Sequence, residues 1–115
     1  MIGIGLDVEE SGALEASVVR LVLSPRETER LESHAASIPH VDRLIFSAKE
    51  SVYKCLFPVT RRAFDFHDVE IHIGDGSFEV EFRDEFAAMR ELGRLTARFA
   101  LTRSHVMTGV TLVSP

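Results

Sequence analysis

The sequence predicts an α+β domain in which a mainly antiparallel sheet packs on one long helix plus shorter helices. Three observations indicate this class. An apolar stripe at helical spacing runs through residues 40–57, long enough to cover one face of a sheet. Two segments, 69–82 and 94–113, alternate apolar and polar residues on either side of a turn, as β-hairpins do. The crossover helices that a doubly wound parallel sheet requires are missing.

Residues 1–8 are predicted to form a strand, because apolar side chains alternate there with Gly3, Gly5 and Asp7. One face of this strand is therefore rich in glycine and ends in an acid. Leucine and valine recur at helical spacing over 13–23, which predicts a short helix.

A second short helix is expected to begin at Pro25. Ser24 and Glu27 are spaced as a capping box, in which each side chain accepts a hydrogen bond from the backbone of the other residue. Proline suits the first helical position. The helix should end before Ile38, because the residue that precedes Pro39 is disfavoured in the helical conformation.

The long helix at 40–57 carries one apolar stripe, which should face the core: Val41, Leu44, Ile45, Ala48, Val52, Cys55 and Leu56. Pro58 is expected to end this helix, and 59–66 has no clean period and should form an ordered loop. The only cysteine, Cys55, cannot form an internal disulfide and is expected in the core.

In the first hairpin, Gly74-Asp75-Gly76 supplies the turn, and no helix follows it as a phosphate-binding loop would need. Asp84 is expected to cap a short helix that ends at Leu92. The second hairpin should pair 94–102 with 106–113.

Length and composition indicate one globular domain spanning residues 1–115, of which 45% are hydrophobic and 27% charged. The net charge of -5 argues against general binding to nucleic acid or to anionic membrane surfaces. No apolar run approaches the roughly 18 residues of a spanning helix, and the first residues lack the signal-peptide pattern. We therefore expect a soluble, cytoplasmic protein without a deep, enclosed cavity.

Two acids on the first strand are candidate metal ligands. Asp7 and Glu9 are two residues apart, so their carboxylates lie on the same face of a strand. Hard oxygen ligands of this kind suit Mg²⁺, which often completes its shell with water and substrate phosphate. The alternative is a pair of solvated acids that protects a strand end from aggregation.

The long helix carries a second candidate group. Glu50 and Lys54 lie one turn apart, off the core stripe, and Lys49 with Tyr53 forms the neighbouring row. A carboxylate and two ammonium groups then share one end of a surface. The alternative is a surface ion pair between Glu50 and Lys54, which would stabilise the helix by roughly a few tenths of a kcal/mol.

Read together, the two segments resemble the 4'-phosphopantetheinyl transferases, which carry a Gly-x-Asp-x-Glu strand followed by a helix with a Lys-Glu-(Ser/Ala)-x-x-Lys motif. Both motifs are intact here, at Gly5-x-Asp7-x-Glu9 and Phe46-Ser47-Ala48-Lys49-Glu50-Ser51-x-x-Lys54. Residues 57–70, Ser24-Pro25-x-Glu27 and Leu101-Thr102-x-x-His105-Val106-x-Thr108 look like the second, C-terminal half of the bacterial enterobactin-type branch.

The resemblance implies transfer of the 4'-phosphopantetheine arm of coenzyme A to a serine of an acyl or peptidyl carrier protein. It implies that Asp7, Glu9 and Glu50 hold Mg²⁺. Lys54 would contact phosphate, and Lys49 would orient or stabilise the same group. Glu50, or a water that it holds, would take the serine proton.

Carrier proteins are acidic, so the resemblance also implies a locally basic docking surface. The candidates are Arg26, Arg30, Arg61 and Arg62, each of which is equally well explained as a solvated arginine. Three phenylalanines are candidates for lining the pantetheine channel, with the core as the alternative: Phe57, Phe64 and Phe66. Tyr53 has the same two explanations, and the five histidines form no catalytic group.

The branch that the chain resembles has two similar halves, with the site between them, and the chain matches one half. The missing half would supply the groups that hold the adenine end of coenzyme A. The chain is expected to be an excised half or a homo-oligomer, a dimer or trimer, with sites between identical subunits, like the short carrier-protein synthases. A non-catalytic module that docks carrier proteins is the third reading. A module without catalytic activity would be expected to lose at least one of Asp7, Glu9 or Glu50. All three are present, which favours an enzyme or a fragment of one.

Overall fold

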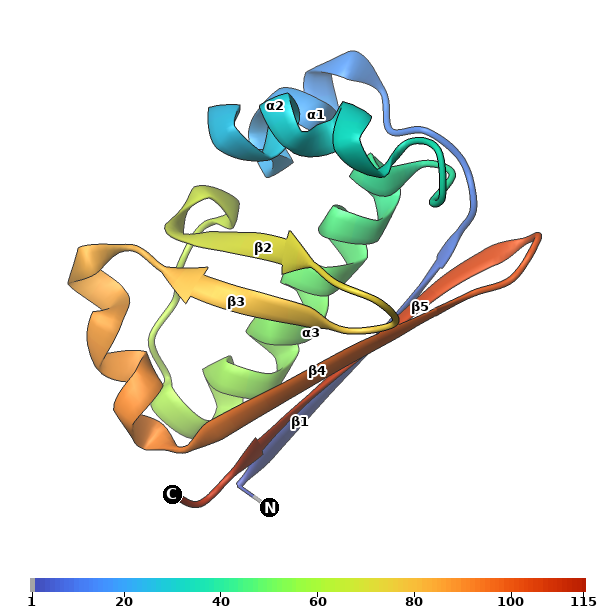
Figure 1. The fold of residues 1–115 in the computed structure, drawn as a ribbon. Coiled ribbons are helices and arrows are strands. Elements are labelled where there is room, and N and C mark those ends of the chain that lie inside the picture. Colours follow the sequence, from blue (N-terminus) through green and yellow to red (C-terminus); the bar gives the residue numbers. More distant parts are fainter. Residues whose placement is uncertain (1) are drawn as a thin grey trace.

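A three-stranded antiparallel sheet forms one side of the fold and packs against one long helix (Figure 1). The structure, a computed structural model, describes residues 2–115. The N-terminal part contains β1 (Gly3–Glu10), α1 (Ala16–Val22), α2 (Pro25–His34) and α3 (Val41–Thr60). The rest contains two 3₁₀ segments and two hairpins: η1 (Phe66–Asp68), β2 (Val69–Ile73), β3 (Phe78–Phe82), η2 (Asp84–Leu92), β4 (Arg94–Leu101) and β5 (His105–Val113). The predicted α+β class is confirmed.

The strands form two sheets. In the larger sheet β5 lies between β1 and β4, antiparallel to both, with Gly3 opposite Leu112 at one end and Glu10 opposite His105 at the other end of the β1–β5 pair. The first and last strands are therefore neighbours, and both chain ends lie at one edge of the molecule (Figure 1). The hairpin β2–β3 forms the second sheet, and a single bridge between Ser77 and Arg98 links it to the larger one.

The helix α3 packs closely against β1 because the strand presents glycine to it. A Cβ atom added at Gly5 would lie 1.9 Å from the carbonyl oxygen of Ser51, and one added at Gly3 would lie 2.7 Å from that of Cys55. No side chain fits at either distance. The alternating glycines therefore bring the strand's acidic end into contact with the helix, and this contact positions the candidate site.

The core lies between α3 and the two sheets. The predicted stripe of α3 is buried, and Cys55 is fully enclosed as predicted. Hydroxyl groups join the helix to the central strand: Thr108 shares hydrogen bonds with Ser47 and Ser51, and its Oγ1 donates to the carbonyl oxygen of Ser47 at 2.9 Å. Burying hydroxyls in this position costs little because each one has a partner.

The long helix continues past the proline that was expected to end it. Pro58 lies in the last turn, and α3 runs on to Thr60. A proline lacks one helical hydrogen bond, but a terminal turn can be closed by its neighbours. Thr60 Oγ1 donates to the carbonyl oxygen of Leu56 at 2.9 Å, and Arg61, in the left-handed conformation (φ 56°), donates its N–H to the carbonyl oxygen of Phe57 at 2.7 Å.

Other boundaries differ by a few residues. The strand β1 extends to Glu10, and Met1 of the predicted strand lies outside the described residues. The capping box at Ser24 is confirmed, with Glu27 N–H 3.1 Å from Ser24 Oγ and Ser24 N–H 2.9 Å from Glu27 Oε1. The expected cap at Asp84 is wrong, because Arg83 occupies the cap position and Asp84 already belongs to η2. Within 2–115, no helix has the length and apolar character needed to cross a membrane.

Candidate active site

The acidic end of β1 and the solvent side of α3 bring four of the sequence-predicted residues together. Asp7 is 6% exposed, and its Oδ1 accepts a hydrogen bond from Lys54 Nζ at 2.9 Å. The same ammonium donates to the carbonyl oxygen of Leu6 at 3.1 Å. Glu9 and Glu50 lie close enough for their charges to act on each other.

Too little positive charge balances these carboxylates. Burial, the hydrogen bond that protonated Glu9 can donate to Asp7, and the charges of Asp7 and Glu50 together raise the pKa of Glu9 to about 7, against the opposing charge of Arg43. Burial and the charge of Asp7 raise the pKa of Glu50 as well. Asp7 Oδ2 is buried and accepts no hydrogen bond. A proton on Glu9 would satisfy that oxygen, and so would a cation.

The donor set fits a hard divalent cation. All three side chains offer carboxylate oxygens, which Mg²⁺ prefers, and the unpartnered Asp7 oxygen is where such an ion would relieve an unfavourable burial. Asp7, Glu9 and Glu50 would hold the ion. The ligand atoms of Asp7, Glu9 and Glu50 are more widely spaced than those of a compact metal site. Among residues 2–115, the group of three whose ligand atoms all lie within 4.8 Å of one another is elsewhere, at Glu70, His72 and Glu81.

Without metal, we expect the free energy of unfolding to fall as the pH rises from 4.5 to about 7. The pKa of Glu9 is about 7 in the folded chain and has its ordinary value of 4.5 in the unfolded one, so the folded state holds more protons across this window and loses stability as they leave. Added Mg²⁺ should remove the decline, because it favours ionised carboxylates. Denaturant titrations on either side of the window measure the effect.

The variant Glu9→Gln is the control for this pH dependence. It has no proton to lose, so its slope with pH should be smaller than that of the natural chain. An unchanged slope in this variant would assign the effect to another group.

The structure buries Lys49 instead of presenting it to solvent. Its ammonium is 2.7 Å from Glu27 Oε1, 2.7 Å from the carbonyl oxygen of Val22 and 2.8 Å from that of Phe66, which uses all three of its donors. Burial lowers the pKa of Lys49, and the charge of Glu27 opposes this. The resemblance implied that Lys49 orients or stabilises the phosphate group. In the structure its ammonium joins three segments, at Val22, Glu27 and Phe66, to α3 beside its neighbour Glu50.

An open groove of about 250 Å³ runs beside these residues. It is lined by Lys49, Glu50, Tyr53, Phe64, Asp65, Phe66 and Val69. Phe64 and Phe66, two of the candidates for a pantetheine channel, thus line this groove. Phe57 is not among the lining residues and packs edge-on against Tyr53, with 5.3 Å between ring centroids. The groove joins an apolar wall to the carboxylate of Glu50.

The four arginines considered for docking all have partners within the chain. Arg26 lies 3.3 Å from Glu70 and 3.7 Å from Glu81, and Arg30 lies 4.0 Å from Glu70. Arg62 stacks over Phe86 at 4.3 Å, and Arg61 lies 6.0 Å from the centroid of the Phe57 ring. Exposed contacts of this kind contribute little to stability and leave these side chains free to exchange partners.

Sequence reasoning missed two residues of the site. Glu27 was identified as a helix cap and not as the partner of Lys49, and no local pattern connects positions 22 residues apart. Arg43 lies 3.9 Å from Glu9 and donates to the carbonyl oxygens of Gly12 and Ala13. Its place beside the acidic end of β1 depends on the loop after the strand, which has no sequence signal.

Comparison with known proteins identifies the class. A family model described as the 4'-phosphopantetheinyl transferase superfamily matches residues 3–107. The chain belongs to this superfamily.

Individual relatives agree with the family model. The 4'-phosphopantetheinyl transferase Svp of Streptomyces mobaraensis is 34% identical over 118 residues, which cover 97% of this chain and 48% of Svp. The 4'-phosphopantetheinyl transferase Npt of Nocardia iowensis is 40% identical over 76 residues, which cover 64% of this chain and 34% of Npt. The chain thus spans about half or less of the length of these relatives.

Solved structures share the fold. Holo-[acyl-carrier-protein] synthase of Helicobacter pylori, determined in complex with coenzyme A, superposes with a TM-score of 0.70 at 17% identity and covers 96% of this chain and 99% of its own. The holo-ACP-synthase of Plasmodium yoelii has a TM-score of 0.64 at 18% identity and covers 100% and 96%. These likenesses confirm the predicted fold.

Proposed function

We propose that this chain, working in the cytoplasm, transfers the 4'-phosphopantetheine arm of coenzyme A to a serine of an acyl or peptidyl carrier protein, with Mg²⁺ as cofactor. One observation carries the proposal: β1 and α3 bring Asp7, Glu50 and Lys54 together beside the apolar groove. The names of the relatives and the coenzyme A in the Helicobacter pylori structure support the substrate class.

Each residue has a defined task in this reaction. Asp7, Glu9 and Glu50 would hold Mg²⁺, which when bound neutralises charge on the pyrophosphate of coenzyme A. Lys54 is about half exposed and paired with Asp7, and it would add a positive charge beside the same group. Burial and the charge of Asp7 raise the pKa of Glu50, which suits it to take the proton of the attacking serine hydroxyl, directly or through a water. The serine oxygen bonds to the β-phosphorus, and adenosine 3',5'-bisphosphate leaves.

Mass spectrometry of an apo acyl carrier protein, incubated with the chain, coenzyme A and Mg²⁺, tests this function. The expected result is a mass increase equal to the phosphopantetheine arm, which disappears with EDTA. A carrier protein whose acceptor serine is replaced by alanine is the control and should gain no mass. If the chain binds the carrier protein but does not increase its mass, either alone or with a partner half, the protein is a non-catalytic module that docks carrier proteins.

We also propose that residues 1–115 are one half-domain, the counterpart of the C-terminal half of a two-half transferase, and that it self-associates into a dimer or trimer when alone. Its length, 48% of Svp, supports the first statement. The surface of β1 supports the second: Ile4, Leu6 and Val8 are 51%, 63% and 60% exposed on the face that turns away from α3. A continuous apolar strand of this kind marks an interaction surface.

Leu6→Asp is expected to convert the oligomer into a folded monomer, because it places a charge in the centre of the apolar strand face. Sedimentation equilibrium measures the mass, and circular dichroism checks the fold. Leu21→Asp is the matched control: Leu21 is 69% exposed on α1, away from this face, and its replacement should leave the mass unchanged. A natural chain that sediments as a monomer would contradict self-association.

A further inference from the structure

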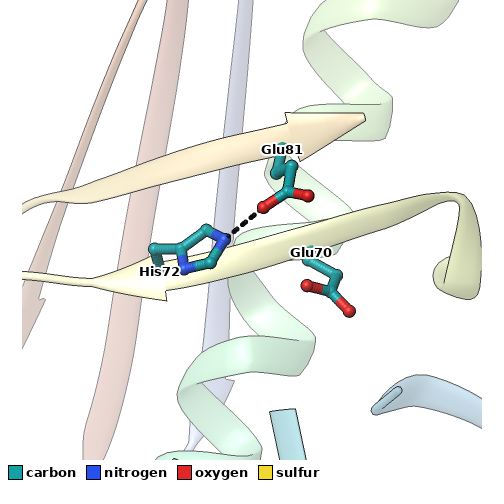
Figure 2. Close-up of side chains that lie close together, drawn as sticks. All are labelled: Glu70, His72 and Glu81. Carbon is teal, nitrogen blue, oxygen red and sulfur yellow. Dashed lines mark hydrogen bonds and ion pairs between the residues drawn. The ribbon is translucent and has the colours of Figure 1, made fainter. Parts of the chain in front are cut away.

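The outer face of the hairpin β2–β3 carries a second group of metal-ligand side chains, separate from the acidic end of β1. Glu70 and His72 come from β2 and Glu81 from β3 (Figure 2). Their ligand atoms all lie within 4.8 Å of one another. This group shares no residue with the candidate active site, and the inference below does not rest on the proposed function.

The strand register creates an electrostatic conflict at this place. Glu70 lies directly opposite Glu81 in the antiparallel pair, and like charges in that position destabilise a hairpin. His72 is on the same face as Glu70, two residues along the strand, and its Nε2 lies 2.8 Å from Glu81 Oε1. Figure 2 shows the imidazole and the carboxylates gathered on one side of the two strands. In the structure the guanidinium of Arg26 lies 3.3 Å from Glu70 and 3.7 Å from Glu81 and offsets part of this repulsion, and a divalent cation between the three side chains would replace it.

The carboxylate of Glu70 is held ready for such a cation. Its side chain is 14% exposed, and its Oε1 accepts a hydrogen bond from Ser24 Oγ at 2.8 Å. Its Oε2 is buried and accepts no hydrogen bond. Arg26 Nη1 lies 3.3 Å from this oxygen and Arg30 Nη2 lies 4.0 Å away, both without hydrogen-bonding geometry. One oxygen of this carboxylate is fixed by a hydrogen bond and the other makes only ion-pair contacts, so the carboxylate is oriented as a hydrogen-bonded metal ligand is.

We propose that Glu70, His72 and Glu81 form a site for a divalent transition metal ion of the Zn²⁺ type. An imidazole nitrogen with two carboxylate oxygens is a ligand set for Zn²⁺ or Co²⁺, whereas Mg²⁺ prefers oxygen alone. Three protein ligands leave one position of a tetrahedral ion for water. Arg26 is 61% exposed, so it can leave the carboxylates when the ion enters. The bound ion would link the hairpin to the start of α2 through Glu70 and Ser24.

Titration with Co²⁺ tests the site, because four-coordinate Co²⁺ has visible absorption bands. The experiment uses an untagged chain with the substitution Asp7→Asn, which weakens Co²⁺ binding at the acidic end of β1. Excess Mg²⁺ in the buffer competes for the same place. The expected result is one equivalent of tightly bound Co²⁺ with four-coordinate bands, and loss of these bands when His72→Gln is added. Zn²⁺ should displace Co²⁺. It should also raise the midpoint of thermal unfolding of the Asp7→Asn chain, but not that of the chain that carries both Asp7→Asn and His72→Gln.

Two further variants sharpen the test. His34→Gln is the matched control, because His34 lies at the end of α2 and belongs to no ligand group, so binding should not change. Arg26→Gln should strengthen Co²⁺ binding, since the competing guanidinium is gone. Absence of four-coordinate bands in the Asp7→Asn chain, or retention of the bands in the chain that also carries His72→Gln, would overturn the proposal.

Discussion

Replacing Glu27 with alanine is expected to destabilise the protein by about 3–5 kcal/mol, because it leaves the buried ammonium of Lys49 without its carboxylate. The side chains of Glu27 and Lys49 are 0% and 1% exposed. Glu27 also accepts hydrogen bonds from the N–H of Ser24 at 2.9 Å and of Ile71 at 2.7 Å, and the substitution removes both. This loss is a large part of the stability of a typical small domain. Urea denaturation measures it.

The same pair predicts a rescue. Breaking a buried ion pair is costly, but replacing both members with apolar residues of similar size is often nearly neutral. The double variant Glu27→Leu with Lys49→Met should therefore be more stable than Glu27→Ala. Glu29→Ala is the matched control, since Glu29 is exposed on the same helix, and its effect should stay within about 0.5 kcal/mol. A Glu27→Ala variant as stable as this control would show that the pair contributes nothing.

The buried pair also connects stability to the candidate active site. Lys49 holds the last turn of α1 through Val22, the helix α2 through Glu27 and the groove wall through Phe66. The next residue in α3 is Glu50, which faces the groove. The pair therefore fixes the backbone from which the proposed base projects, and a residue can contribute to catalysis by positioning without touching the substrate.

Local signals in the sequence predicted most of the fold. The capping box at Ser24 needs only residues three apart, and it forms as predicted. Both hairpins follow from alternation and turn residues, and the structure has them. Pro58 was misread because a proline in a helix interior breaks it, whereas one in the last turn can be accommodated when Thr60 and Arg61 close that turn.

The site was less predictable because it depends on contacts distant in sequence. Asp7 and Glu50 could be placed near each other only through a resemblance, and the physical reason for their approach is the glycine face of β1. The contacts of Lys49 with Val22, Glu27 and Phe66 have no periodic signal. Glu70, His72 and Glu81 were overlooked because their grouping depends on the cross-strand register, which a hairpin prediction gives only approximately.

Replacing Glu50 with glutamine is expected to lower the rate of phosphopantetheine transfer by roughly 10²- to 10⁴-fold, the range that a general base contributes. Glutamine keeps the shape of the side chain and cannot take the serine proton. Because the substitution removes one of several mutually repelling carboxylates, the fold should be kept or slightly stabilised. Single-turnover transfer to an apo carrier protein, followed by mass, measures the rate. Glu10→Gln, at the exposed end of β1, is the control and should retain the rate.

Comparing Glu50→Gln with Asp7→Asn separates the two tasks proposed for Glu50. In the proposed reaction Asp7 binds Mg²⁺ and takes no proton. Any loss of transfer in Asp7→Asn should therefore come from weaker Mg²⁺ binding and should become smaller at high Mg²⁺. If Glu50 is also the base, the defect of Glu50→Gln should persist when Mg²⁺ saturates the enzyme. Full recovery of both variants at high Mg²⁺ would make Glu50 a metal ligand alone, and full activity of Glu50→Gln at the lowest Mg²⁺ concentration that supports the natural chain would remove it from both roles.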